Sequence, residues 1–156
     1  MTDRKLDIEN IGRIGQMFLN ADILGNILVD RFTCDDDDTD YNIEVFNELK
    51  ITLMKIERLN PDIYITGAVW YWYPANKKMA APVIAGRAQA AVGWVISPCN
   101  EALYKCMSED VNTSTAMPEG KTVHYFPLRD SNCDVIGALE LTEGAEYGMF
   151  EKHYNS

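Results

Sequence analysis

The residues of this 156-residue chain best suited to reaction chemistry are its cysteines. Cys99 and Cys106 lie seven positions apart, close to two turns of helix, so a helix would bring both thiols to one face. A cysteine near a helix N-terminus, as Cys99 would be, has its thiolate stabilised by the helix dipole. With Cys133 as a third candidate, these are the reactive thiols that the sequence offers. The competing interpretation is that all three are unreactive thiols in or near the core.

A zinc site is not predicted. The chain has four cysteines and two histidines, but it contains no Cys-x-x-Cys pair, and neither His124 nor His153 neighbours a cysteine in sequence. We therefore expect all the cysteines, Cys34 included, to be free thiols in a reducing compartment.

The acidic stretch 34–40, CDDDDTD, invites comparison with a calcium loop. Counted from Asp36, the sixth position of such a loop would be Tyr41 instead of glycine, and the twelfth would be Asn47 instead of glutamate. The sharp turn and the bidentate ligand are therefore both missing. The stretch is better interpreted as a solvated acidic loop, and no metal ligand is predicted.

Aromatic residues are concentrated in a predicted strand, 63–73, where two tyrosines alternate with Trp70 and Trp72. Such faces can line a ligand pocket, or they can be core on one face and a covered surface on the other. His124 lies in a second apolar strand. It could ligate haem, and the competing interpretation is a hydrogen-bonded core histidine. The candidate ligand-binding residues are Trp70, Trp72, Trp94, Tyr104, His124, Tyr125 and Phe126.

Two helical segments precede these strands. Residues 6–32 have apolar residues at mixed spacings of three to six, and a break near Asp22, as a possible N-cap, would divide them into two helices. Residues 40–60 have the clearer stripe, with apolar residues every three or four positions and Pro61 as the stop. The first segment is expected either to pack on its own sheet or to form a dimer interface.

The middle of the chain is predicted to contain a return strand at 79–85, which Pro82 makes an edge or a bulge. Residues 86–96 fit either a short helix or a strand. We expect a helix over 99–107, with Ser97 as its cap and Pro98 near its first position. A polar loop is expected over 111–120, and a short tail after 141.

Composition limits the classes of function. The formal net charge is −10, which argues against nucleic-acid binding because phosphates would be repelled. The chain contains no apolar run of about 18 residues, so no membrane span is predicted. The N-terminus lacks the apolar core of a signal peptide, so we expect a cytoplasmic protein that acts without a membrane.

The stretch 123–141, VHYFPLRDSNCDVIGALEL, predicts a β-hairpin with a turn-rich centre. Pro127 marks an edge, a bulge or the end of the first arm, and Gly137 predicts close approach by a neighbour or ligand. The pattern of aromatic-Pro-Leu-Arg-Asp, a polar turn and Asp-Val-Ile-Gly-Ala-Leu-Glu-Leu resembles the closing hairpin of GAF domains. Cys133 departs from that family, because it stands where glycine is commonest.

The resemblance covers roughly residues 41–141 and implies an α+β fold, with a central antiparallel sheet of five to six strands flanked by helices. It divides the chain into N-terminal helices with an acidic loop, 1–40, and a sensory domain of the GAF/PAS superfamily, 41–156. It implies a non-catalytic regulatory module that binds a small molecule, mediates dimerisation, or does both, within a larger signalling or scaffold protein.

No cofactor follows from the resemblance, because the family's cyclic-nucleotide signature and the cysteine–histidine neighbours of a bilin site are not visible. An alternative implied by the resemblance is a GAF-type enzyme that reduces free methionine sulfoxide with a nucleophilic and a resolving cysteine. The glycines that flank those cysteines in that family are not matched here, so a non-enzyme is favoured.

The last expectation concerns assembly. Apolar residues of the segment 6–32 supply more apolar surface than one sheet face is expected to cover, and large exposed patches are rare on monomers. A homodimer through this segment, with 41–60 contributing, would bury that surface around a two-fold axis.

Overall fold

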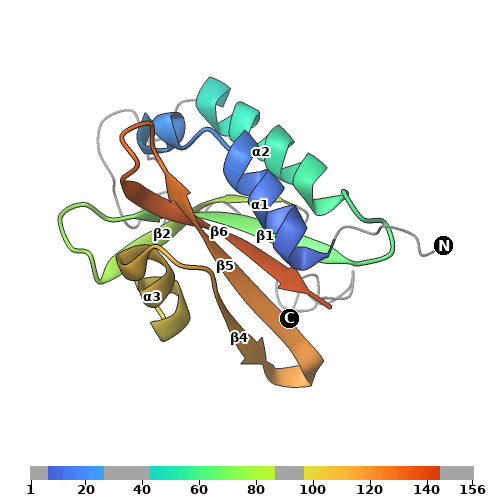
Figure 1. The fold of residues 1–156 in the computed structure, drawn as a ribbon. Coiled ribbons are helices and arrows are strands. Elements are labelled where there is room, and N and C mark those ends of the chain that lie inside the picture. Colours follow the sequence, from blue (N-terminus) through green and yellow to red (C-terminus); the bar gives the residue numbers. More distant parts are fainter. Residues whose placement is uncertain (1–6, 27–42, 87–96, 145–156) are drawn as a thin grey trace, which may run out of the picture.

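Six antiparallel strands form the sheet of this α+β protein, in the order β3-β2-β1-β6-β5-β4 (Figure 1). The computed structural model describes residues 7–26, 43–86 and 97–144. The predicted fold class is confirmed. In chain order the elements are α1 (Ile8–Phe18), the 3-10 helix η1 (Ala21–Asn26), α2 (Ile43–Glu57), β1 (Ile65–Trp72), β2 (Met79–Ala85), β3 (Ser97–Pro98), α3 (Glu101–Glu109), β4 (Thr113–Met117), the 3-10 turn η2 (Pro118–Gly120), β5 (Lys121–Arg129) and β6 (Val135–Glu143).

The predicted hairpin is β5–β6, and it supplies the centre of the sheet. Cys133, in its turn, has a φ of 66°, a left-handed conformation that glycine adopts without cost. Pro127 lies where β5 has become an edge strand, since β4 pairs with β5 only as far as Tyr125. Gly137 is closely approached by a neighbour, because a Cβ there would lie 2.1 Å from the backbone oxygen of Trp70.

One face of the sheet is covered by α1 and α2, which lie side by side in Figure 1. Side chains alternate between the two faces of a strand, so every second residue of β1, β5 and β6 points to these helices. The core on this side, called the helix side below, contains Ile11, Leu24, Leu49, Leu53, Ile56, Ile65, Val69, Ile84, Phe126, Leu128, Leu139 and Leu141. Glycines let α1 approach closely: a Cβ on Gly12 would lie 2.3 Å from the ring of Phe126.

The break predicted within the segment 6–32 is present, because α1 and η1 are separate helices. α1 ends at Phe18, and after the cap residue Leu19 the chain turns into η1. Asp22 does not act as the predicted N-cap. The side chain of Asn20 accepts a hydrogen bond from the backbone N–H of Asp22, and the carboxylate of Asp22 accepts one from Ser131 in the β5–β6 turn, at 2.7 Å.

Two expectations about the middle of the chain were wrong. Ser97 and Pro98 are not the start of a helix but form the short edge strand β3. Asn100 caps α3 instead, because its side-chain oxygen accepts the backbone N–H of Leu103 at 2.8 Å. Part of the predicted loop 111–120 is β4, which pairs with β5 and extends the sheet.

Other predictions agree with the structure or lie outside the residues it describes. β2 carries the bulge expected at Pro82, because the register with β1 shifts between Val69 and Trp70. The acidic stretch 34–40 and most of the segment 86–96 lie outside the described residues. α1 and η1 share the helix-side core with later elements, and the domain boundary between 40 and 41 stays a prediction. Within 7–26, 43–86 and 97–144, no helix has both the length and the apolar character needed to cross a bilayer.

Candidate functional site

The opposite face of the sheet, which α3 covers, is called the α3 side. Leu103, Cys106 and Met107 of α3 pack there against Val123 and Tyr125 of β5. Trp70 and Trp72 of β1 point to the same side, since they alternate with Val69 in the helix-side core. This second core is smaller than the first, and it carries polar groups among its aromatic side chains.

A row of hydrogen bonds crosses the α3 side around Glu140. Glu140 lies in the central strand β6, directly opposite Ala68 of β1 and Tyr125 of β5. Its carboxylate accepts the indole N–H of Trp70 at 3.0 Å and the hydroxyl of Tyr125. That hydroxyl accepts from the side-chain amide of Asn100 at 2.8 Å. Because Asn100 also caps α3, the row connects the centre of the sheet to the start of that helix.

Burial dominates the electrostatics of this row. Desolvation raises the pKa of Glu140, and the hydrogen bonds from Trp70 and Tyr125 oppose that effect by favouring the carboxylate. Desolvation and the nearby carboxylate together raise the pKa of Tyr125, so its hydroxyl keeps its proton and donates. Within the described part of the chain, no lysine or arginine pairs with Glu140.

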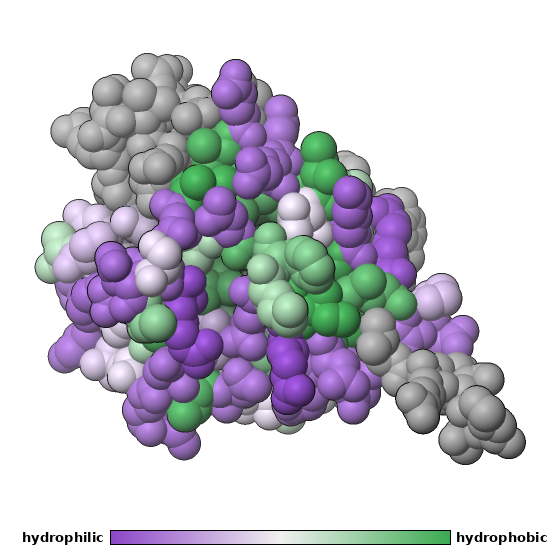
Figure 2. All heavy atoms as spheres, turned by 45° about the horizontal axis from the view of Figure 1, so that its top comes forward, coloured by the Kyte–Doolittle hydropathy of each residue, from purple (hydrophilic) through white to green (hydrophobic). Residues whose placement is uncertain are grey.

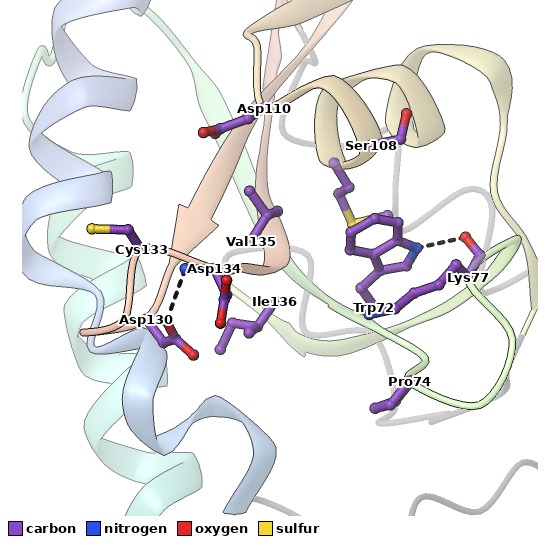
Figure 3. A pocket seen from close by; sticks show the side chains of 11 residues that line it. Trp72, Pro74, Lys77, Ser108, Asp110, Asp130, Cys133, Asp134, Val135 and Ile136 are labelled. Carbon is purple, nitrogen blue, oxygen red and sulfur yellow. Dashed lines mark hydrogen bonds between the residues drawn. The ribbon is translucent and has the colours of Figure 1, made fainter.

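A cleft of about 600 Å³ borders the α3 side, at the end of the sheet where β1 ends and β6 begins. Figure 3 shows its walls: Trp72 at the end of β1, Lys77 from the β1–β2 connection, the end of α3 with Asp110, and the β5–β6 turn with Asp130 and Asp134. It is open to solvent. The amine of Lys77 lies 4.3 Å from the centre of the Trp72 ring, a cation–π contact.

Two acidic residues of the cleft, Asp110 and Asp130, have structural partners for their carboxylates. Asp110 pairs with Arg129 at 2.7 Å, and one carboxylate oxygen of Asp130 accepts the backbone N–H groups of Asn132 and Asp134. Across the described residues, no three His, Cys, Asp or Glu side chains gather in a way that would hold a metal ion.

The structure brings some of the predicted ligand-binding residues together. Trp70 and Tyr125 meet at Glu140, and Trp72 lines the cleft. Tyr104 lies on α3 and is largely exposed. Trp94 lies outside the described residues.

His124 and Phe126 face the other way, into the helix side. Phe126 is 1% exposed beneath Gly12 of α1, so it belongs to the core. The Nε2 atom of His124 is buried without a hydrogen bond and lies 3.5 Å from the carboxylate of Glu143. His124 is therefore only partly buried, and its Nε2 atom lacks the hydrogen bond that the core-histidine interpretation predicted.

The surroundings of Cys99 and Cys106 disfavour the thiolate, which is the reactive form of cysteine. Burial, with a contribution from Asp110, raises the pKa of Cys106 to about 12. Burial also raises the pKa of Cys99, which precedes the cap residue of α3. Cys133 is exposed on the β5–β6 turn. Cys99 and Cys106 are therefore protonated at neutral pH, and a protonated thiol is a poor nucleophile.

Sequence reasoning missed two acidic residues. Glu140 alternates with Leu139 and Leu141, a pattern that normally places the polar residue in water. Glu57, at the end of α2, is fully buried and accepts the backbone N–H of Gly67 at 2.6 Å. The one available signal was glycine in strand-like stretches, because Gly67 and Gly86 make room for the side chain of Glu57.

Comparison with known proteins adds little to this geometry. No family model matches the chain, and no curated protein matches it. Among solved structures it is similar to a light-oxygen-voltage domain studied with a flavin analogue, with 14% identity over 58% of this chain and 86% of that chain. The TM-score of 0.35 is too low for an argument about function.

Proposed function

We propose that this chain is a non-catalytic regulatory module of the GAF/PAS type that binds a small molecule on its α3 side. The observation that carries the proposal is the open cleft of about 600 Å³, whose walls include Trp72, Lys77 and the end of α3. A concave site with an aromatic wall and a few polar side chains is the usual form of a ligand site.

The same geometry supports a regulatory role. The end of α3 forms a wall of the cleft, and the start of α3 is tied to the sheet through Asn100 and Tyr125. A ligand in the cleft would therefore contact the end of a short helix whose start is fixed to the sheet. A ligand can shift an equilibrium between two positions of α3 by as much as its affinities for the two differ.

The experiment is native mass spectrometry of the purified chain, followed by a thermal-shift screen of small molecules. We expect a co-purifying compound, or a compound that raises the melting temperature in the chain and not in the Trp72→Ala variant. Tyr104→Ala is the matched control, because it removes an exposed aromatic residue of α3 outside the cleft. If no compound co-purifies and none stabilises the chain, the proposal fails.

A second function, homodimerisation, is supported by exposed apolar residues on the helix side. Phe18 and Met17 at the end of α1 are 65% and 73% exposed, and Ile51 of α2 is 54% exposed. Figure 2 shows hydrophobic patches on this side, divided by hydrophilic residues. Ile11 and Leu24, in contrast, are buried in the chain's own core. The proposed interface is therefore narrower than the whole segment 6–32 and centres on Phe18.

A further inference from the structure

We infer that the cleft takes a ligand with an organic cation, whose charged group replaces the amine of Lys77 on the face of Trp72. The inference rests on the proposed function and names the class of ligand for the same cleft. It follows from the contact between these two side chains, from the charges of the cleft walls and from the apolar part of its lining.

The first step is the aromatic surface that the cleft offers. Trp72 lines the cleft, is half-buried, and packs against the core of the α3 side. Its indole N–H donates to the backbone oxygen of Lys77, the dashed line beside Trp72 in Figure 3, so the ring is held in one orientation. A ring that is already in place loses little freedom when a ligand binds on it, which favours affinity.

The second step is the cation that already occupies this surface. The amine of Lys77 lies 4.3 Å from the centre of the Trp72 ring. Tryptophan attracts cations through the negative face of its ring, and the chain itself shows that this ring accepts one. Lys77 is exposed and has a long, flexible side chain, so its amine can move from the ring into water when another cation arrives.

The third step is the charge of the walls. Three carboxylates, those of Asp110, Asp130 and Asp134, line the cleft together with the one amine of Lys77. Arg129 neutralises only Asp110. Among the described residues, the hydrogen bonds of Asp134 use its backbone atoms, so its carboxylate is available to a ligand. Walls with an excess of negative charge attract a cation and repel an anion.

The fourth step is the size and the apolar part of the lining. Pro74, Met107, Val135 and Ile136 also line the cleft, whose volume of about 600 Å³ is far larger than a metal ion. In the part of the chain that the structure describes, no three acidic, histidine or cysteine side chains gather to hold a metal. Apolar walls stabilise alkyl groups by removing them from water. The expected cation is therefore an ammonium group that carries alkyl groups.

The test compares three probes of nearly the same shape. Choline is the cation, neohexyl alcohol has carbon in place of the choline nitrogen, and tert-butylacetate is the corresponding anion. Binding is measured by calorimetry, and we expect choline to bind more tightly than both analogues by about tenfold or more. In NMR spectra of the unmodified chain, the Trp72 ring should shift the ε-methylene protons of Lys77, and choline should remove that shift by displacing the amine.

The variants test the displacement directly. Lys77→Ala removes the competing amine and should tighten choline binding by about two- to fivefold, the equivalent of an exposed cation–π contact. Lys78→Ala is the matched control, because it removes the same charge from the neighbouring residue, which is outside the cleft lining. Both lysines are exposed, so both variants should fold. Trp72→Leu keeps an apolar side chain but removes the aromatic face, and it should lose choline binding.

The outcomes separate this inference from the proposed function. The inference is overturned, and the small-molecule module stands, if choline binds no more tightly than neohexyl alcohol. The same conclusion follows if Lys77→Ala binds choline no more tightly than Lys78→Ala does, or if a folded Trp72→Leu chain binds it unchanged. If choline does not bind while a compound from the screen binds, the cation inference alone fails. If nothing binds at all, both fail.

Discussion

Replacing Gly12 by alanine tests whether α1 is packed on the chain's own sheet. A Cβ at position 12 would lie 2.3, 2.3 and 2.5 Å from three atoms of the Phe126 ring. Carbon atoms in contact are about 3.5–4.0 Å apart, so the helix or the ring must move by about 1 Å. Phe126 is 1% exposed, so the core encloses the ring.

The magnitude follows from two opposing terms. Overpacking a core costs about 1–3 kcal/mol, whereas alanine in place of glycine inside a helix contributes about 0.5–1 kcal/mol. We expect Gly12→Ala to lower the free energy of unfolding by about 1–2 kcal/mol. For a chain of this size, that corresponds to a fall in melting temperature of about 2–8 °C.

The assay is urea unfolding followed by circular dichroism, with an unchanged m-value showing that only stability has changed. Gly15→Ala is the matched control in the same helix, because its Cβ would meet mainly the end of the flexible Leu139 side chain, and it should cost less. Phe126→Leu should relieve part of the Gly12→Ala effect, with a coupling of about 0.5 kcal/mol or more. A Gly12→Ala chain stabilised by about 0.5–1 kcal/mol, as at an exposed helical glycine, would refute the close packing of α1.

Three further predictions concern the turn, the thiols and the proposed dimer. Cys133→Gly should raise the free energy of unfolding by about 0.5–1 kcal/mol, because glycine adopts a φ of 66° without steric cost. A lower free energy of unfolding in urea would contradict this. Iodoacetamide at pH 7.5 should label the exposed Cys133. It should leave Cys106, whose pKa is raised to about 12, unlabelled until the chain unfolds. Rapid labelling of Cys106 would support the alternative of a thiol-dependent enzyme. In sedimentation, Phe18→Asp should convert a dimer to a folded monomer. Leu24→Asp should instead unfold the chain, because this residue is 2% exposed. If the unmodified chain is a monomer at tens of micromolar, the dimer proposal is wrong.

Sequence reasoning worked best where one local signal was enough. The apolar stripe of 40–60 predicted α2 because a 3.6-residue period leaves little choice of structure. The turn chemistry and flanking β-branched residues predicted the hairpin β5–β6, and Gly137 predicted a close neighbour that proved to be the backbone of Trp70. The helix and the hairpin depend on residues near one another in the chain, so the sequence alone determines them, whereas only the pairing of β1 with β6 decided which neighbour approaches Gly137.

The tertiary structure decided which elements meet. Ser97 and Pro98 look like a helix start, but pairing with β2 makes them a strand, and the capping role passes to Asn100. His124 and Tyr125 are neighbours in sequence, yet a strand sends them to opposite faces, one beneath the helices and one to Glu140. The alternation of Glu140 with two leucines is typical of a solvated residue, but in the structure its carboxyl is buried beside Trp70 and Tyr125. Burial depends on contacts between distant segments, so the candidate site appears only once the sheet has brought them together.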